Sequence, residues 1–148
     1  MKRARRAILL AGLTLTTLCG CMGLAEEHKE ARNLEIRDID FSGLEAGVYH
    51  GAYDGGMKAW RRNQVEVRVG PGQVEAIDLV SSAELDRGDP DYQALVARVV
   101  EEQSLQVDVI SGATLTSKAH LKAMELALLQ AVPATEPAAA GSDHKRGD

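Results

Sequence analysis

The central part of the chain alternates apolar and polar residues in a pattern that predicts three strands. Residues 48–53 form the first strand, and the Asp-Gly-Gly sequence at 54–56 supplies turn residues that tolerate positive φ. Residues 65–69 alternate valine with charged side chains, and after the turn-forming sequence at 70–73 a further strand follows over 74–80. Because the connecting turn is short, we expect the last two strands to be antiparallel neighbours.

The pattern changes to helical spacing after residue 88. Asp89 is a capping residue, Pro90 suits the first turn of a helix, and Asp91 adds a negative charge at the positive end of the helix dipole. These residues predict a helix start. The helix then presents apolar side chains at helical spacing, which we expect to be buried: Tyr92, Leu95, Val96 and Val99.

A second helix is predicted after a short apolar run. Residues 106–110 indicate a strand, residues 111–114 form a turn, and Thr116 or Ser117 is placed to cap the following helix. The apolar stripe of this helix consists of Leu121, Met124, Leu128 and Ala131. Together these elements predict an α+β domain in which a small antiparallel sheet packs with two helices.

The N-terminal segment is typical of an exported lipoprotein. Four basic residues within positions 2–6 precede an apolar run over 7–18, which has the length of a signal-peptide core and is too short to span a bilayer as a stable helix. The sequence Leu-Cys-Gly-Cys at 18–21 resembles the lipobox of bacterial lipoproteins. This resemblance implies that residues 1–20 are a cleaved signal peptide and that Cys21 is the lipidated residue.

Other interpretations of the two cysteines fit less well. If Cys19 were the modified residue, bulky Leu18 would stand beside the cleavage site, where a small residue is required. A metal or redox pair of Cys19 and Cys21 is an alternative, but a C-x-C sequence alone lacks further ligands. Lipidation would tether the protein to a bacterial membrane with its domain on the extracytoplasmic side, in the periplasm or at the cell surface.

Composition and charge indicate the boundaries and limit the partners. We expect a lipidated N-terminus and spacer over 21–46, a folded domain over 47–132, and a disordered tail over 133–148, which is rich in Ala, Pro and Gly. Removal of the leader leaves 13 basic against 22 acidic residues, so the mature surface is acidic. With only 3% aromatic residues, the chain has few side chains on which bases could stack, which argues against nucleic acid as a partner.

The candidate chemistry is concentrated in the turn before the last helix. Small residues at Gly112 and Ala113 let a ligand approach the backbone, next to a cluster of four hydroxyls: Ser111, Thr114, Thr116 and Ser117. A helix N-terminus presents unpaired N–H groups and a partial positive charge, so a phosphate there would be stabilised. Ordinary capping and turn formation are the alternative explanation. We predict no metal site and interpret the histidines, which lack metal-ligand spacing, as surface residues: His28, His50, His120 and His144.

The same residues follow a longer pattern, in which Asp is followed by two residues, Ser or Thr, Gly, Ala, and Ser or Thr. The positions are filled in register by Asp108, Ser111, Gly112, Ala113 and Thr114. In this pattern, residues 107–119 strongly resemble the FMN-binding domain family, which includes flavin subunits of sodium-pumping quinone reductase. The resemblance covers residues 47–129, so it implies that the predicted domain over 47–132 is of this type. The loop at 81–88 lacks the Glu-Thr-Pro-Gly sequence of many larger members, as in the shorter branch of the family.

The resemblance implies that FMN is attached covalently through its phosphate to Thr114. A separate, metal-dependent flavin transferase would move FMN from FAD to the threonine, with AMP leaving, and would recognise Asp108, Ser111, Gly112 and Ala113. Thr116 and Ser117 are candidates for hydrogen bonds to the attached phosphate. A threonine hydroxyl has a very high pKa, and the sequence offers no evident His or Lys base beside it, so activation must come from outside the chain.

The resemblance favours a membrane-anchored flavin electron carrier, working with other redox proteins, over a stand-alone enzyme. A second hypothesis is a lipid-anchored adaptor module of a redox complex that holds no working flavin, although the intact Thr114 argues against it. A third hypothesis is a reductase in its own right. The chain lacks the Gly-rich fingerprint of nicotinamide-binding domains, which argues against direct reduction by a nicotinamide.

Overall fold

The computed structural model of the protein describes residue 26 and residues 29–30, 32–56, 59 and 61–134. The predicted signal peptide, Cys21, His28, His144 and most of the predicted tail lie outside these residues. Three strands form one antiparallel sheet in sequence order, β1 (Gly47–Tyr53), β2 (Asn63–Gly70) and β3 (Gln73–Ser82). A short 3-10 helix precedes the sheet and two α-helices follow it: η1 (Phe41–Gly43), α2 (Pro90–Glu102) and α3 (Thr114–Leu128).

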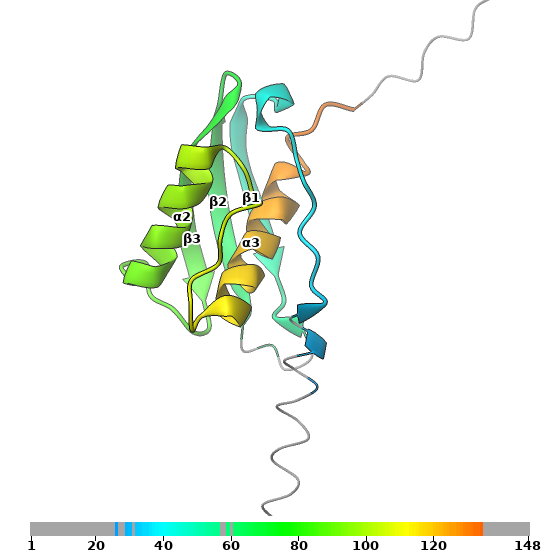
Figure 1. Ribbon diagram of the computed structural model, residues 1–148. Helices are drawn as coiled ribbons and strands as arrows, with labels where there is room; N and C mark the ends of the chain where they lie inside the picture. The colour runs from blue at the N-terminus through cyan, green and yellow to red at the C-terminus, as the bar shows by residue number, and fades with distance from the viewer. Residues whose placement is uncertain (1–25, 27–28, 31, 57–58, 60, 135–148) are drawn as a thin grey trace, which may run out of the picture.

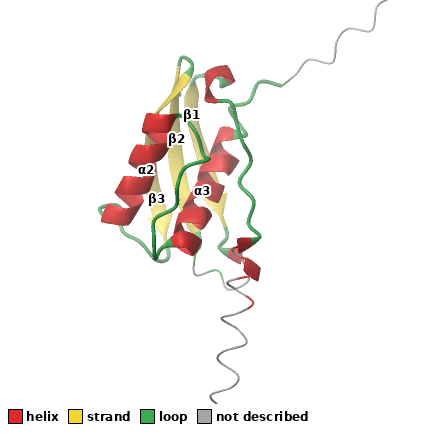
Figure 2. Cartoon of the chain, in the orientation of Figure 1, coloured by secondary structure: helices red, strands yellow, loops and turns green. Residues whose placement is uncertain are grey.

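Both α-helices lie on one face of the sheet, as Figures 1 and 2 show. Helix α3 packs against β1 and β2, whereas α2 packs against β3. The valines of β2 that alternate with charged residues, Val65, Val67 and Val69, are buried beneath the helices. The expected α+β architecture, a small antiparallel sheet with two helices, is therefore confirmed.

The hairpin between β2 and β3 forms where the sequence predicts it. Gly70 pairs with Gln73, which leaves Pro71 and Gly72 at the tip. Gly72 has a φ of +74°, a conformation that glycine adopts without a Cβ penalty. The stripe predicted for α3 is also buried, because Leu121, Met124, Leu128 and Ala131 all belong to the core.

Helix α3 approaches the backbone of β1 very closely at Gly51. A Cβ placed on Gly51 would overlap the carbonyl oxygen of Ala123 and crowd the backbone nitrogen of Ala127. Asn63 at the start of β2 adds a hydrogen bond to α3, since its side-chain amide donates to the carbonyl of Ala119 at 3.2 Å. These contacts fix the position of α3, and with it the position of the turn that precedes the helix.

The strand predicted over residues 106–110 is absent, and these residues form an extended loop segment. The segment runs between α2 and α3 (Figure 1), so no neighbouring strand is available for pairing. Leu105 and Val107 are buried while Asp108 is exposed, which explains the apolar pattern. Side chains bind part of its backbone instead, since Arg98 donates to the Asp108 carbonyl at 2.6 Å.

The segment before β1, which the sequence suggested as a spacer, contributes to the core. Ile39, Phe41 and Leu44 are buried within it. Lys118 of α3 donates to the carbonyls of Arg32 and Leu34, at 3.0 and 3.3 Å, and so holds the chain along the helix. The packed structure therefore begins before Gly47, because these apolar side chains are part of the hydrophobic core.

Candidate functional site

The turn before α3 has the geometry that its Gly112 requires. The N–H of Ala113 donates to the carbonyl of Ile110 at 3.0 Å, and Gly112 has a φ of +85°. A positive φ at the third residue is the mark of a type II turn, where glycine is favoured. A Cβ on Gly112 would meet no atom within 4 Å, so the backbone conformation, not the space, selects glycine here.

Helix α3 begins at Thr114, and neither of the predicted capping residues, Thr116 and Ser117, is its N-cap. Its N-cap is Ala113, and no side chain accepts a hydrogen bond there. Ser117 lies inside the helix, where its buried hydroxyl oxygen accepts from the Ile110 N–H at 3.3 Å. Thr116 donates to Glu84 of the loop after β3 at 2.9 Å. An N-terminus without a side-chain cap keeps backbone donors available for an anion.

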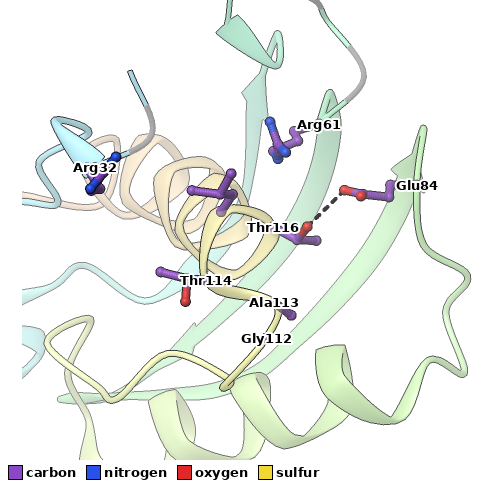
Figure 3. A pocket seen from close by; sticks show the side chains of 8 residues that line it. Arg32, Arg61, Glu84, Gly112, Ala113, Thr114 and Thr116 are labelled. Carbon is purple, nitrogen blue, oxygen red and sulfur yellow. Dashed lines mark hydrogen bonds between the residues drawn. The ribbon is translucent and has the colours of Figure 1, made fainter. Parts of the chain in front are cut away.

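Beside this helix start lies an open cavity of about 550 Å³. Thr114 is exposed and lines this cavity, and Figure 3 shows the side chains that line the cavity. The cavity is lined by Arg32, Arg61, Glu84, Gly112, Ala113, Thr114, Leu115 and Thr116. The volume is within the range of ligand pockets in proteins.

Two of the lining residues, Arg32 and Arg61, were not predicted from the sequence. Arg32 comes from the segment that runs along α3, and Arg61 comes from the residues just before β2 (Figure 3). They are distant from the motif in sequence, and no local pattern marks them, so only the fold brings them to the cavity that Thr114 also lines. Their positive charges add to the partial positive charge at the start of α3.

The predicted site residues divide into three groups. Gly112, Ala113, Thr114 and Thr116 line the cavity. Ser117 lines a smaller adjoining cavity. Asp108 and Ser111 are exposed and line neither one.

The smaller cavity has a volume of about 220 Å³ and lies between the turn and helix α2. It shares Glu84, Gly112, Ala113 and Thr116 with the larger one, and its other lining residues are Leu85, Asp91, Tyr92, Leu95, Ser117 and His120. The two cavities therefore adjoin each other at the same turn and helix start.

The interpretation of His120 as a surface residue is wrong, since this side chain is only 2% exposed. It lies on the inward face of α3, one position before Leu121 of the buried stripe. Burial lowers the pKa of His120 to about 4, an effect that the negative charge of Asp89 partly counteracts. His50 on β1 is exposed, as expected.

Neither a metal centre nor a membrane span is found in the part of the chain that the structure describes. Within residues 26, 29–30, 32–56, 59 and 61–134, no three His, Cys, Asp or Glu residues form a group that could hold a metal ion. Over the same residues, no helix has the length and apolar character needed to cross a bilayer.

Comparison with known families points to the class of ligand that this segment binds. Residues 59–129 match the model of the FMN-binding domain. The matched region contains Arg61, the turn, Thr114 and all of α3, and it supports membership of the FMN-binding domain family and the binding of FMN. Comparisons with curated proteins and with solved structures gave no significant match.

The geometry fits the phosphate end of FMN. Thr114 places an exposed hydroxyl at a helix N-terminus that has no side-chain cap, and two arginines line the same cavity. A phosphate bound there would meet N–H donors, the helix dipole and the arginine charges together. The turn and the start of α3 therefore offer a candidate phosphate site within the segment that matches the FMN-binding domain.

Proposed function

We propose that this protein is a membrane-anchored, extracytoplasmic electron-transfer protein that carries FMN linked through its phosphate to Thr114. The observation that carries the proposal is the position of Thr114. Its exposed hydroxyl lies at the N-terminus of α3, where no side chain caps the helix, in a cavity that two arginines also line. That position lies within the segment matched by the FMN-binding domain.

The linkage is a phosphoester made by transfer from FAD. A bond forms between the Thr114 hydroxyl oxygen and the phosphorus on the FMN side of the pyrophosphate. The bond from that phosphorus to the bridging oxygen breaks, AMP leaves, and the hydroxyl proton passes to solvent or to the leaving phosphate. No His or Lys is among the residues that line the cavity, and the carboxylate of Glu84 accepts from Thr116. A separate flavin transferase, which would supply the activation, is therefore a proposed partner.

The protein's own contribution is to hold and neutralise the linked phosphate. The first backbone N–H groups of α3 would donate to its oxygens, and Arg32 and Arg61 would offset its charge. The bound flavin supplies the redox chemistry, whereas the chain determines its position and surroundings. We propose that the electrons pass between membrane and extracytoplasmic redox proteins.

The anchor is the second part of the proposal. The signal-like sequence over 1–20 and the lipobox-like sequence ending at Cys21 support attachment of the protein to a bacterial membrane by lipid. Metabolic labelling with a fatty acid tests this part, since the wild-type protein should take up label and a Cys21→Ser variant should not.

The linkage is tested by producing the protein together with a flavin transferase and denaturing it before analysis. The peptide that contains Thr114 should carry flavin fluorescence and an FMN-sized mass gain. Thr114→Ala should lose both, while Thr116→Ala, which changes a neighbouring hydroxyl in the same cavity, should keep both. Colour that washes away on denaturation would refute the covalent linkage, and colourless protein would favour the adaptor hypothesis.

A further inference from the structure

Two polar atoms are buried between α2 and α3 without a hydrogen-bond partner among the described residues. They are the hydroxyl of Tyr92 and the Nδ1 atom of His120, on side chains that are each 2% exposed. The two rings meet edge to face, with centroids 5.0 Å apart and planes inclined at 64°. A buried polar atom that lacks a partner costs about 1–3 kcal/mol, so a site that retains two such atoms calls for an explanation.

Both residues line the smaller cavity, which adjoins the one at Thr114. Leu85 and Leu95 give this cavity apolar walls. Its volume of about 220 Å³ is small for a whole ligand, but it suits one edge of a ligand that is bound in the larger cavity at Thr114. The unpartnered atoms thus belong to residues of the cavity that adjoins the proposed phosphate site.

The protonation states of the pair make it complementary to a particular kind of edge. Burial lowers the pKa of His120 to about 4, so at neutral pH one of its ring nitrogens is an acceptor. Burial also raises the pKa of the Tyr92 hydroxyl, so this group stays protonated and serves as a donor. The pyrimidine edge of a flavin ring presents an N–H donor flanked by carbonyl acceptors, which matches one acceptor and one donor side by side.

We propose that Tyr92 and His120 bind the pyrimidine edge of the flavin ring, with the Tyr92 hydroxyl donating to a ring carbonyl and a His120 ring nitrogen accepting from the ring N–H. The identity of the ring rests on the function proposed above. The two side chains act as binding and positioning residues for the ring, while the start of α3 holds the phosphate. A donor on a ring carbonyl favours the electron-rich reduced flavin, so loss of the Tyr92 hydroxyl should lower the midpoint potential of the loaded protein.

Riboflavin separates the ring site from the phosphate linkage, because it has the ring but no phosphate. The full chain, produced without a flavin transferase, is titrated with riboflavin while flavin fluorescence is followed. We expect saturable binding, and we expect Tyr92→Phe to raise the dissociation constant about tenfold, the effect of one hydrogen bond. His120→Gln should also weaken binding, and it replaces Tyr92→Phe as the test if that variant does not fold. Tyr49→Phe is the matched control, since its hydroxyl donates to the Glu45 carbonyl and lies outside both cavities.

The outcomes test the ring site at Tyr92 and His120 separately from the covalent linkage at Thr114. Failure to bind riboflavin, or equal affinity in the wild type and the folded variant, would overturn the ring site even if Thr114 becomes flavinylated. Binding that depends on Tyr92 while Thr114 stays bare under co-production would support the ring site and overturn the covalent linkage. Loss of stability in Tyr92→Phe with unchanged riboflavin affinity would assign the pair a structural role alone.

Discussion

Acid should destabilise this domain through His120 more than through any exposed histidine. The pKa of His120 is lowered to about 4 in the folded protein, against 6.5 for the unfolded chain. As the pH falls below 6.5, the unfolded chain takes up a proton that the folded protein binds only near pH 4. The stability is therefore fully present above pH 6.5 and is lost progressively as the pH falls toward 4.

The size of the effect follows from the two pKa values. One pKa unit is worth about 1.4 kcal/mol, so the difference between 6.5 and about 4 corresponds to a loss of about 3 kcal/mol. Since small domains have free energies of unfolding of about 5–15 kcal/mol, this loss should be easy to measure. Asp89 opposes the effect of burial, so removal of its charge should enlarge the loss.

Urea unfolding at about pH 7 and about pH 4.5 measures most of this loss, which is complete only below the folded pKa. Carboxylates also titrate in this range, so the informative quantity is the difference between wild type and His120→Gln. His120→Gln should lose less stability than the wild type between the two pH values, because glutamine takes up no proton. His50→Gln, which changes a histidine whose side chain is 67% exposed, should keep the wild-type pH dependence. If His120→Gln loses as much stability on acidification as the wild type, the buried neutral histidine is not the cause and the reasoning fails.

Two further predictions concern how α3 is held. Gly51→Ala should lower the free energy of unfolding by about 3 kcal/mol, because the new methyl group would overlap the backbone of α3 at Ala123. Gly43→Ala, where an added Cβ meets nothing within 4 Å, should change stability little, and equal urea midpoints for the two variants would contradict the close approach. Glu125→Gln should cost about 2 kcal/mol in urea unfolding, because the buried carboxylate binds Lys122 at 2.8 Å and accepts from the Arg37 N–H at 3.2 Å. An unchanged midpoint would show that the carboxylate charge contributes nothing there.

Much of the fold was predictable because the signals are local. The valines of β2 alternate with a period of two residues, and this pattern alone indicates which face is buried. Asp89 caps α2 as predicted, since its carboxylate accepts from the N–H groups of Asp91 and Tyr92. The turn at Gly112 and the helix that follows were likewise predictable from a run of neighbours, whereas the proposal that Thr114 carries the flavin came from the resemblance of this run to a known family.

Other features arise from contacts between groups that are distant in sequence, so they could not be predicted from local patterns. Residues 106–110 have a strand-like pattern, but a strand needs a neighbour to pair with, and two helices enclose this segment instead. Arg32 and Arg61 reach the cavity only because the fold brings their segments to the start of α3. The burial of His120 depends on α2 covering that face of α3, since side-chain exposure is set by packing between elements and not by the residue type.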